Sequence, residues 1–149
     1  MIALLQRVAR AQVDVAGETI AAIGAGLLVF FCAERGDEDA DVDRLLARVL
    51  RMRCFPDNDG RMNRSVQDTG GELLVVPQFT LAADTSSGHR PGFSAAAAPD
   101  EGARRFERFV ERARAEHGRV QAGRFGADMQ VALVNDGPVT LWVRTNARA

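Results

Sequence analysis

The 149-residue sequence predicts a mixed α/β fold, a single domain over 1–149 with layered, partly barrel-like β-sheets covered by two helices. Most of the apolar runs are short and are separated by glycine turns, which is typical of strands. Two longer segments repeat apolar residues with the period of a helix, and no repeat or linker divides the chain. A sheet that must cover both helices and bury its own second face favours layers or a partly closed barrel.

The N-terminal part predicts three strands. Valines between polar or small residues indicate a strand over 8–15, and the pattern resumes after a Gly17-Glu18 turn at Thr19–Ile23. A second glycine turn leads into Leu27–Cys32, a continuous apolar run that suits a buried strand.

Two helices are predicted, one from about Glu38 to Arg53 and one from Pro99 to a stop at Gly118. Acidic residues crowd the start of the first and arginines its end, which suits the helix dipole. Proline favours the first turn of the second. The apolar faces comprise Val42, Leu45, Leu46, Val49 and Leu50 in the first helix, and Ala103, Phe106, Phe109, Val110 and Ala113 in the second.

Between and after the helices, further strands and turns are predicted. Residues 56–60 form a turn, and Glu72–Val76 form a buried strand whose ladder Pro77 ends because proline has no N–H to donate. Residues 82–98 are small and polar and indicate a loop. The last predicted strands are 120–122, 129–135 and 139–145, the final two on either side of an Asp136-Gly137-Pro138 turn.

The composition excludes several kinds of catalysis. All 19 basic residues are arginine and there is no tyrosine, so neither a Schiff-base lysine nor a phenolic acid is available. His89, His117, Cys32 and Cys54 lie far apart in the sequence and lack metal-ligand spacing. A dedicated zinc site is therefore not expected.

The cysteine content and the apolar runs of the sequence also indicate where the protein is located. Two lone cysteines fit a reducing compartment better than a disulfide framework. The N-terminal segment is charged too early for a signal peptide, and no apolar run approaches the ~18 residues that a membrane span needs. We expect a cytoplasmic protein with no membrane association.

Two surface motifs have ordinary explanations. Gly92–Ala96 begins like the nucleophile elbow of serine hydrolases but has alanine in place of the second glycine, and no strand leads into it. Six arginines and two aspartates within residues 44–64 leave a local charge of +4, which could meet phosphates. A solvated helix end is the commoner explanation of such a cluster.

Two backbone segments are the remaining candidates. Pro77-Gln78-Phe79-Thr80-Leu81 follows a buried strand, where main-chain N–H groups at a sheet edge can bind an oxyanion. Gly137-Pro138 lies between two strands and is either an ordinary turn or a cis peptide. Each signal is weak by itself.

Together these segments resemble the D-aminoacyl-tRNA deacylases, and the resemblance covers nearly the whole chain. It is carried by many blocks in the family's order: Gln6-Arg7-Val8, Gly26-Leu27-Leu28, Asp59-Gly60-Arg61-Met62-Asn63, Gly71–Val76, Gln78-Phe79-Thr80-Leu81, Arg90-Pro91, Gly123–Met129 and Asn135-Asp136-Gly137-Pro138-Val139-Thr140.

The resemblance implies an ester hydrolase that proofreads tRNA charging. Such an enzyme removes D-amino acids, and glycine mischarged on tRNA-Ala, from the 3′ end of aminoacyl-tRNA. It implies a homodimer with the substrate at the dimer interface, and no metal or organic cofactor. The scarcity of catalytic side chains is then expected, because the reacting groups are main-chain amides, water and a tRNA 2′-OH.

The resemblance also assigns residues. Main-chain groups of Gln78, Phe79 and Thr80 hold the aminoacyl ester, and Gly137-Pro138 of the other subunit, as a Gly-cisPro motif, leaves no room for an L side chain. Thr80 is an alternative nucleophile, although no general base is evident beside it.

Three further positions match the family's substrate-binding residues. Phe125 and Met129 match residues that line the terminal-adenosine pocket, and Arg7 matches an arginine that steadies the Gly–Pro loop. Without the resemblance, Phe125 and Met129 could equally be core residues, and Arg7 a strand-surface residue.

Pro77 departs from the family, which usually has serine before Gln-Phe-Thr. Proline removes a hydroxyl and a backbone N–H. Two alternatives follow: a deacylase of relaxed specificity that also accepts L-alanyl-tRNA, as in a branch with proline here, or a catalytically weakened dimer that only binds tRNA.

Overall fold

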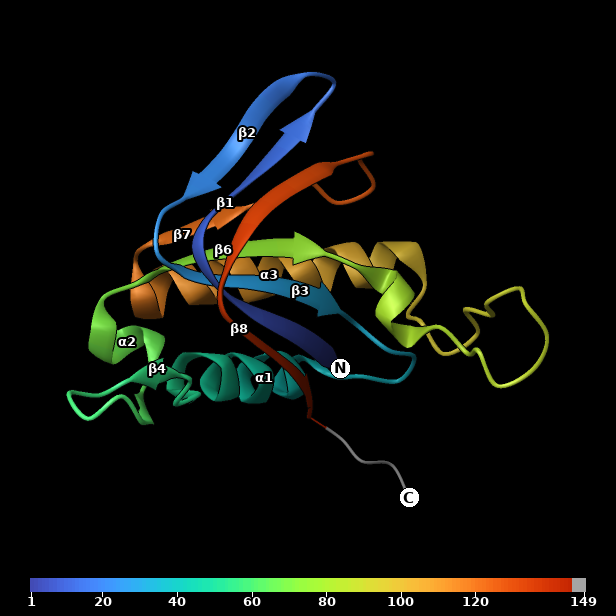
Figure 1. Cartoon of the computed structure of the whole chain (residues 1–149). Helices are drawn as coiled ribbons and strands as arrows, with labels where there is room; N and C mark the ends of the chain where they lie inside the picture. Colours follow the sequence, from blue (N-terminus) through green and yellow to red (C-terminus); the bar gives the residue numbers. More distant parts are fainter. Residues whose placement is uncertain (146–149) are drawn as a thin grey trace.

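The computed structural model describes residues 1–145 and is built on one curved sheet (Figure 1). The strand order is β2-β1-β3-β6-β7, and β8 pairs with the remaining edge of β1. A separate two-stranded sheet joins β4 to β5. The elements are β1 (Ile2–Val15), β2 (Glu18–Ile23), β3 (Gly26–Cys32), α1 (Asp39–Arg51), β4 (Phe55–Pro56), β5 (Met62–Arg64), α2 (Val66–Thr69), β6 (Glu72–Pro77), the 3₁₀ turn η1 (Phe79–Ala82), α3 (Pro99–His117), β7 (Val120–Ala122) and β8 (Gln130–Arg144).

The long strand β1 organises the sheet because it pairs with three others. Its first half lies between β3 and β8, and its second half lies between β2 and β8. Strands β1 and β2 form an antiparallel hairpin, and β3 returns to pair antiparallel with the first half of β1. Strands β3 and β6 are parallel and are joined through α1. The strand bends between these halves, so the sheet curls until β2 contacts β6 and β7.

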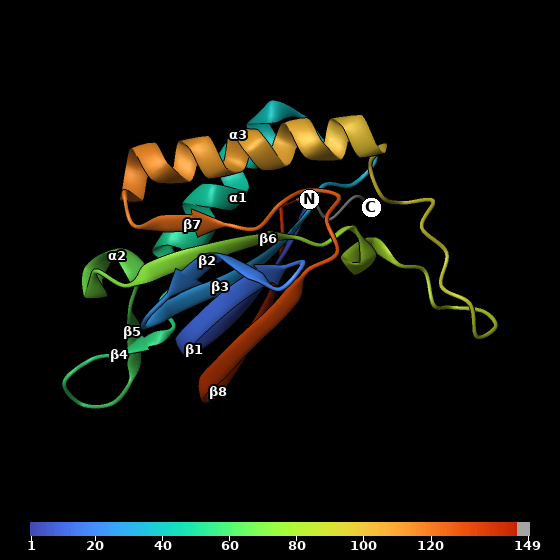
Figure 2. The same ribbon diagram turned by 90° about the horizontal axis from the view of Figure 1, so that it is seen from above.

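Helices α1 and α3 lie together on one face of the sheet (Figure 2). Their apolar stripes bury Leu45, Leu46 and Phe109 against Leu5 and Val29 of the sheet. The opposite face holds a second core, between the curled strands, that includes Val8, Val13, Ile23, Leu28 and Leu74. Strands β3 and β6 are therefore buried on both faces along most of their length, which accounts for their continuous apolar runs.

The predicted mixed α/β fold with a barrel-like sheet is confirmed, and both long helices begin and end within two residues of their predicted bounds. Three predictions were incomplete. The described residues contain a third short helix, α2, and the β4–β5 hairpin surrounds the predicted 56–60 turn. The predicted strand near Val8 begins earlier, at Ile2.

One prediction about the last strands was wrong. The two strands expected on either side of Asp136-Gly137-Pro138 form the single strand β8, and the expected turn is a bulge within it. A turn would have reversed the chain, whereas here both halves of β8 continue along the same partner, β1.

Pro77 is the last residue of β6, and its pair with Phe31 is the last of that ladder, which therefore ends at Pro77 as predicted. Successive N–H groups along β6 point toward opposite neighbouring strands. The Leu73 N–H donates to the Arg119 carbonyl, next to β7, and the Gln78 N–H donates to the Phe31 carbonyl of β3 at 2.7 Å. By this alternation the Pro77 nitrogen faces the β7 side, where β7 has already ended at Ala122. No ladder hydrogen bond is lost.

We expect Gly26→Ala to prevent β3 from pairing closely with β6. A Cβ atom at Gly26 would lie 1.9 Å from the Glu72 carbonyl oxygen, which is backbone and cannot rotate away. Forced overpacking of this kind should lower the free energy of unfolding by about 3 kcal/mol, measured by urea denaturation.

Gly24→Ala is the matched control, because its Cβ would lie 3.4 Å from the movable Glu72 side chain. Equal stability of the two variants would contradict the close approach of β3 and β6.

Candidate active site

A cavity of about 480 Å³ lies at the C-terminal ends of the parallel strands β3 and β6. The start of α3 and the segment after β7 complete its wall. Its lining is mostly apolar, as in small-molecule sites where a few polar groups fix the ligand. The lining residues are Phe31, Cys32, Ala33, Val76, Pro77, Gln78, Phe79, Ala97, Pro99, Gly102, Phe125, Gly126, Ala127, Met129 and Val131.

The structure brings together five of the residues predicted for the site. Pro77, Gln78 and Phe79 form one side of the cavity, and Phe125 and Met129 form the other. Thr80 follows directly on η1 but does not line the wall. The remaining three predicted residues, Arg7, Gly137 and Pro138, lie outside this cavity.

The segment after β6 presents main-chain donors beside the cavity. Gln78 leaves the sheet by donating its N–H to Phe31, and η1 begins at the next residue. The N–H groups of Phe79 and Thr80 open this turn and therefore have no acceptor within it. Within residues 1–145 no side-chain oxygen accepts a hydrogen bond from either of them.

The Thr80 hydroxyl accepts a hydrogen bond from the Gln78 side-chain amide. An amide is not a base, so this contact orients the hydroxyl without activating it. Neither histidine is near: His89 belongs to the exposed 84–95 loop, and the His117 ring is 2.7 Å from the Gly71 carbonyl at the far end of α3.

Phe79 keeps 55% of its surface exposed although its backbone is fixed. Its ring packs edge-on against Phe93, with centroids 5.1 Å apart. Phe93 belongs to the segment that resembled a nucleophile elbow, and the structure shows that segment as part of a loop. Its aromatic residue, rather than Ser94, therefore lies next to the candidate site.

Phe125 closes the cavity against the first turn of α3. A Cβ on Gly102 would lie 3.3 Å from the tip of the Phe125 ring, so glycine allows the ring to sit directly on the helix. Met129 is placed similarly, because a Cβ on Gly123 would lie 2.9 Å from its sulfur. Both predicted pocket residues are thus held by neighbouring glycines.

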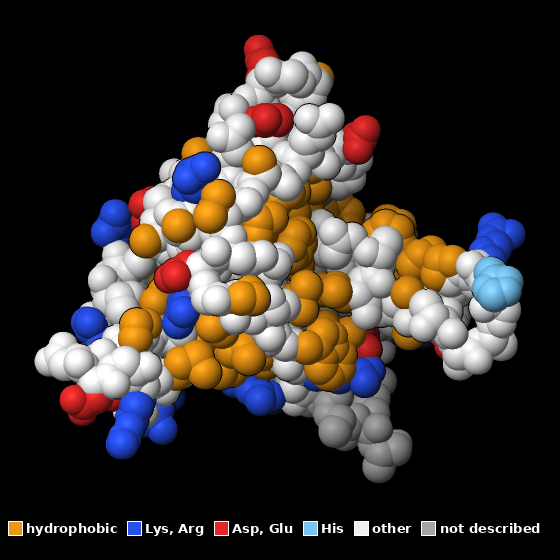
Figure 3. Space-filling view, in the orientation of Figure 1, with side chains coloured by type: hydrophobic (Ala, Val, Ile, Leu, Met, Phe, Trp, Pro, Cys, Tyr) orange, Lys and Arg blue, Asp and Glu red, His pale blue; other side chains and the backbone are white. Residues whose placement is uncertain are grey.

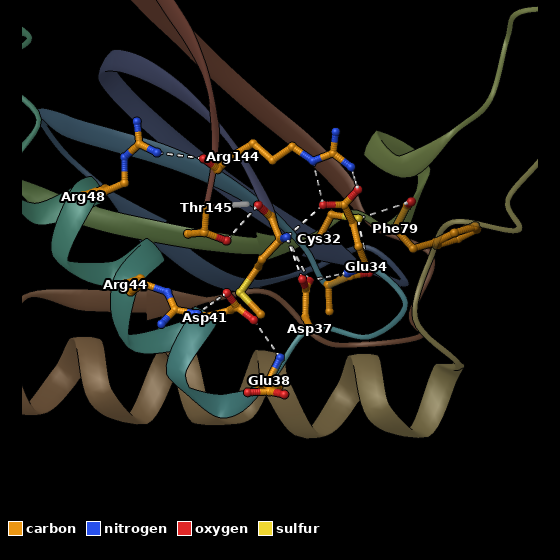
Figure 4. A network of polar contacts seen from close by, with 12 residues as sticks. Cys32, Glu34, Asp37, Glu38, Asp41, Arg44, Arg48, Phe79, Arg144 and Thr145 are labelled. Atoms are coloured by element: carbon orange, nitrogen blue, oxygen red, sulfur yellow. Dashed lines mark hydrogen bonds and ion pairs between the residues drawn. The ribbon is translucent and has the colours of Figure 1, made fainter. Parts of the chain in front are cut away.

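Cys32 lines the cavity but is a poor nucleophile. Burial, and then the nearby charge of Glu34, raise the pKa of its thiol to about 11. Its sulfur lies 3.5 Å from the Phe79 carbonyl oxygen, as Figure 4 shows. The thiol is therefore protonated near neutrality and helps to position the Phe79 main chain.

Near Cys32, a network of hydrogen bonds and ion pairs connects the ends of three strands (Figure 4). The amino group of Met1 donates to Glu34 at 2.8 Å and to Asp37 at 2.9 Å, and Arg144 of β8 pairs with Glu34. Burial opposes ionisation of Glu34, but the hydrogen bonds from Arg144 and the amino group outweigh it and lower its pKa. The network joins the ends of β1, β3 and β8 beneath the cavity.

Arg7 holds the bulge that contains Gly137 and Pro138. Gln6 pairs with Thr140 and Val8 with Asn135, so the single residue Arg7 faces the four residues 136–139. Its guanidinium is mostly buried and donates to the Asp136 carbonyl at 3.0 Å and to the Cys54 carbonyl at 2.7 Å.

Glycine is required at the tip of this bulge. Gly137 has φ of +132°, and a Cβ there would lie 2.9 Å from Val139 and 3.2 Å from the Arg7 guanidinium. The Gly137–Pro138 peptide bond is cis. Both residues are exposed, so the bulge projects away from its own chain.

The fold places the protein in a known structural class. A solved structure described as the c-Myc DNA unwinding element binding protein superposes with a TM-score of 0.93 at 36% identity, covering 99% of this chain and 100% of that one. A second, described as a probable eukaryotic D-amino acid tRNA deacylase, has a TM-score of 0.82 at 20% identity over 95% and 97% of the two chains, which shows the same fold.

Sequence comparison identifies the family. The family model described as D-Tyr-tRNA(Tyr) deacylase matches residues 4–144. Proteins named D-aminoacyl-tRNA deacylase are 67% identical in Variovorax paradoxus (strain S110), over 95% of this chain and 97% of the relative, and 62% identical in Paracidovorax citrulli (strain AAC00-1), over 97% and 93%. The chain belongs to the D-Tyr-tRNA(Tyr) deacylase family, which confirms the predicted family and enzyme class.

Sequence reasoning missed Cys32, Gly102 and Phe93. A parallel pairing of the strand ending at Cys32 with the strand ending at Pro77 would have placed Cys32 at the cavity, whereas no local pattern points to Gly102 or Phe93. Within the described residues no group of three or more His, Cys, Asp or Glu side chains could hold a metal ion. No helix of residues 1–145 is long and apolar enough to cross a membrane.

We expect Gly102→Ala to displace the Phe125 ring into the cavity and to raise the deacylase KM several-fold. Alanine is the better helix former by up to about 1 kcal/mol, so the melting temperature should not fall. Steady-state kinetics and thermal unfolding measure the two effects. Glu107→Ala, an exposed change on the same helix, is the control, and an unaltered KM for Gly102→Ala would contradict the proposed packing.

Proposed function

We propose that this protein hydrolyses the ester bond between a D-amino acid, or glycine mischarged on tRNA-Ala, and the 3′ end of tRNA. The observation that carries the proposal is the 60–67% identity to D-aminoacyl-tRNA deacylases over nearly the whole chain. The reaction is a proofreading step in translation, and we place it in the cytoplasm, where charged tRNA is used.

The cavity supports hydrolysis by main-chain groups. The ester carbonyl lies at the turn after β6, where the unpaired N–H groups of Phe79 and Thr80 stabilise the developing oxyanion. A water molecule, activated with the help of the tRNA 2′-OH, adds to the carbonyl carbon. The bond to the ribose oxygen then breaks, and that oxygen takes the proton that the water has lost.

Thr80 as a covalent nucleophile is the weaker alternative. Its hydroxyl accepts a hydrogen bond from the Gln78 side-chain amide, and no histidine or carboxylate lies in the cavity wall. A threonine nucleophile requires an adjacent base. Main-chain catalysis needs neither.

We further propose that the enzyme acts as a homodimer, because one chain does not complete the site. Gly137 and Pro138 are exposed and lie outside the cavity of their own chain. A second copy that presents this bulge to the cavity would close it. The terminal adenosine would then lie against Phe125 and Met129.

An apolar surface supports this association. Trp142 of β8 faces Leu4 of β1, which in turn faces Phe30 of β3, and Trp142 keeps 55% of its surface exposed. Hydrophobic side chains gather over this face of the sheet, opposite the helices (Figure 3). Such a row of exposed apolar side chains is typical of an interaction surface.

The enzyme would distinguish D- from L-aminoacyl-tRNA by sterically excluding the L side chain. The bulge is held in place by Arg7 and has no flexible side chain at Gly137. A rigid backbone that occupies the space of an L side chain rejects L-aminoacyl-tRNA, whereas a D side chain points elsewhere and glycine has none. The Gly-cisPro pair of the partner subunit is the selective element in this proposal.

The test is hydrolysis of D-tyrosyl-, glycyl- and L-tyrosyl-tRNA by the purified protein. We expect strong acceleration over spontaneous hydrolysis for the first two and none for the third. No acceleration for any of them would refute the proposed function. Rapid cleavage of L-alanyl-tRNA in a parallel reaction would establish the relaxed-specificity alternative.

Pro77 tests the second alternative, a weakened enzyme that mainly binds tRNA. The Pro77 ring faces Gly123, because a Cβ atom added to Gly123 would lie 3.5 Å from the proline Cδ. An N–H group at position 77 would therefore point toward Gly123 and not toward η1. We therefore expect Pro77→Ser to change kcat by less than about threefold. A rise of about 10²–10³, the effect of one oxyanion donor, would show that proline weakens the enzyme.

A further inference from the structure

A second depression lies at the C-terminal end of α1, next to the β4–β5 hairpin. Its volume is about 490 Å³, and three of its six lining residues are arginine while none is acidic. Two methionines supply apolar surface between these charges. We name it the arginine groove; it is lined by Ala47, Arg48, Arg51, Met52, Arg53 and Met62.

The charges of the arginine groove are not neutralised. Arg51 and Arg53 are exposed and have no acidic partner within residues 1–145, and Arg48 donates to a main-chain oxygen, that of Arg144. Arginines on α3 behave differently, because Arg104 and Arg108 pair with Asp39 and Asp43 of α1. The net charge of the chain is only −1, so the positive potential is local.

The groove is far from the cavity of its own chain. Helix α1 connects the parallel strands β3 and β6 and runs back against them, so its last turn lies near the start of β6. The cavity lies at the opposite ends of the same strands. Figure 3 shows arginine side chains at the lower left, over the hairpin, away from η1.

The groove is close, however, to the bulge of β8. Arg7 bridges the carbonyl of Cys54, next to the groove residue Arg53, and the carbonyl of Asp136, next to Gly137. One guanidinium thus fixes the groove edge and the bulge relative to each other. If a second copy presents its bulge to the cavity, as proposed above, its arginine groove would lie near the mouth of that cavity.

We propose that the arginine groove binds phosphates of the tRNA strand that leads to the 3′ end held in the partner subunit's cavity. This inference rests on the proposed function. Guanidinium groups bind phosphate oxygens in pairs of hydrogen bonds, and the methionines offer apolar contact to sugars or bases. Such contacts position an RNA strand without reading its sequence, which suits an enzyme that acts on many tRNAs.

The test compares Arg51→Gln/Arg53→Gln with Arg112→Gln/Arg114→Gln, which removes the same charge from α3. KM is measured for D-tyrosyl-tRNA and for D-tyrosyl-adenosine, which lacks phosphates, at several salt concentrations. For the groove variant we expect KM for the tRNA to rise at least about tenfold more than KM for the adenosine ester. The slope of log KM against log salt should fall by about 1.5 to 2, roughly one unit per lost phosphate contact.

Two results would overturn the proposal. One is a KM for the tRNA that stays at the value of the wild type or of the α3 control. The other is an equal loss on both substrates, which would make the groove a support of the cavity. Binding of uncharged tRNA is measured separately by fluorescence anisotropy, with at least tenfold weaker binding expected for the groove variant. This measurement judges the groove even if the wild-type protein hydrolyses no aminoacyl-tRNA, a result that would refute only the proposed function.

Discussion

The unequal pairing of β1 and β8 at Arg7 is the constraint on which most of this structure depends. Four residues of β8 face one residue of β1, and the space they enclose is filled by the Arg7 guanidinium. Without a long cation there, the Asp136 and Cys54 carbonyls would lose a charge-assisted hydrogen-bond partner. The same contact shapes the projecting bulge, keeps β8 on one strand partner and fixes the edge of the arginine groove.

A second feature is that the polar groups of the cavity belong mainly to the backbone. The turn after β6 leaves the N–H groups of Phe79 and Thr80 unpaired, and the buried Cys32 thiol contacts the Phe79 carbonyl while its pKa is too high for nucleophilic attack. Backbone donors held by a sheet need no reorganisation during a reaction. This explains how a chain without lysine or tyrosine, and with both histidines outside the cavity, can belong to a family of hydrolases.

The sequence predicts what depends on local periodicity and fails where distant segments decide. Val120–Ala122 was predicted residue for residue, and both long helices nearly so, because their apolar spacing reflects the face they bury. The bulge in β8 was mistaken for a turn, since Asp-Gly-Pro is typical of turns and the opposing Arg7 is about 130 positions away. The segment from Pro77 to Phe79 was a weak candidate from its place after a buried strand, whereas Phe125 and Met129 were found only through resemblance. Phe125 gives the same local signal whether it lines a cavity or fills a core.

The two candidate binding regions would be related to each other through the proposed dimer. Within one chain the cavity and the arginine groove lie at opposite ends of the same strands. Arg7 couples the groove to the bulge, so in the proposed dimer the positive charge of the groove would lie near the entrance of the cavity that the bulge completes. A single contact at Arg7 would thus make chiral selection and tRNA positioning properties of the same interface, so that neither is available to an isolated chain.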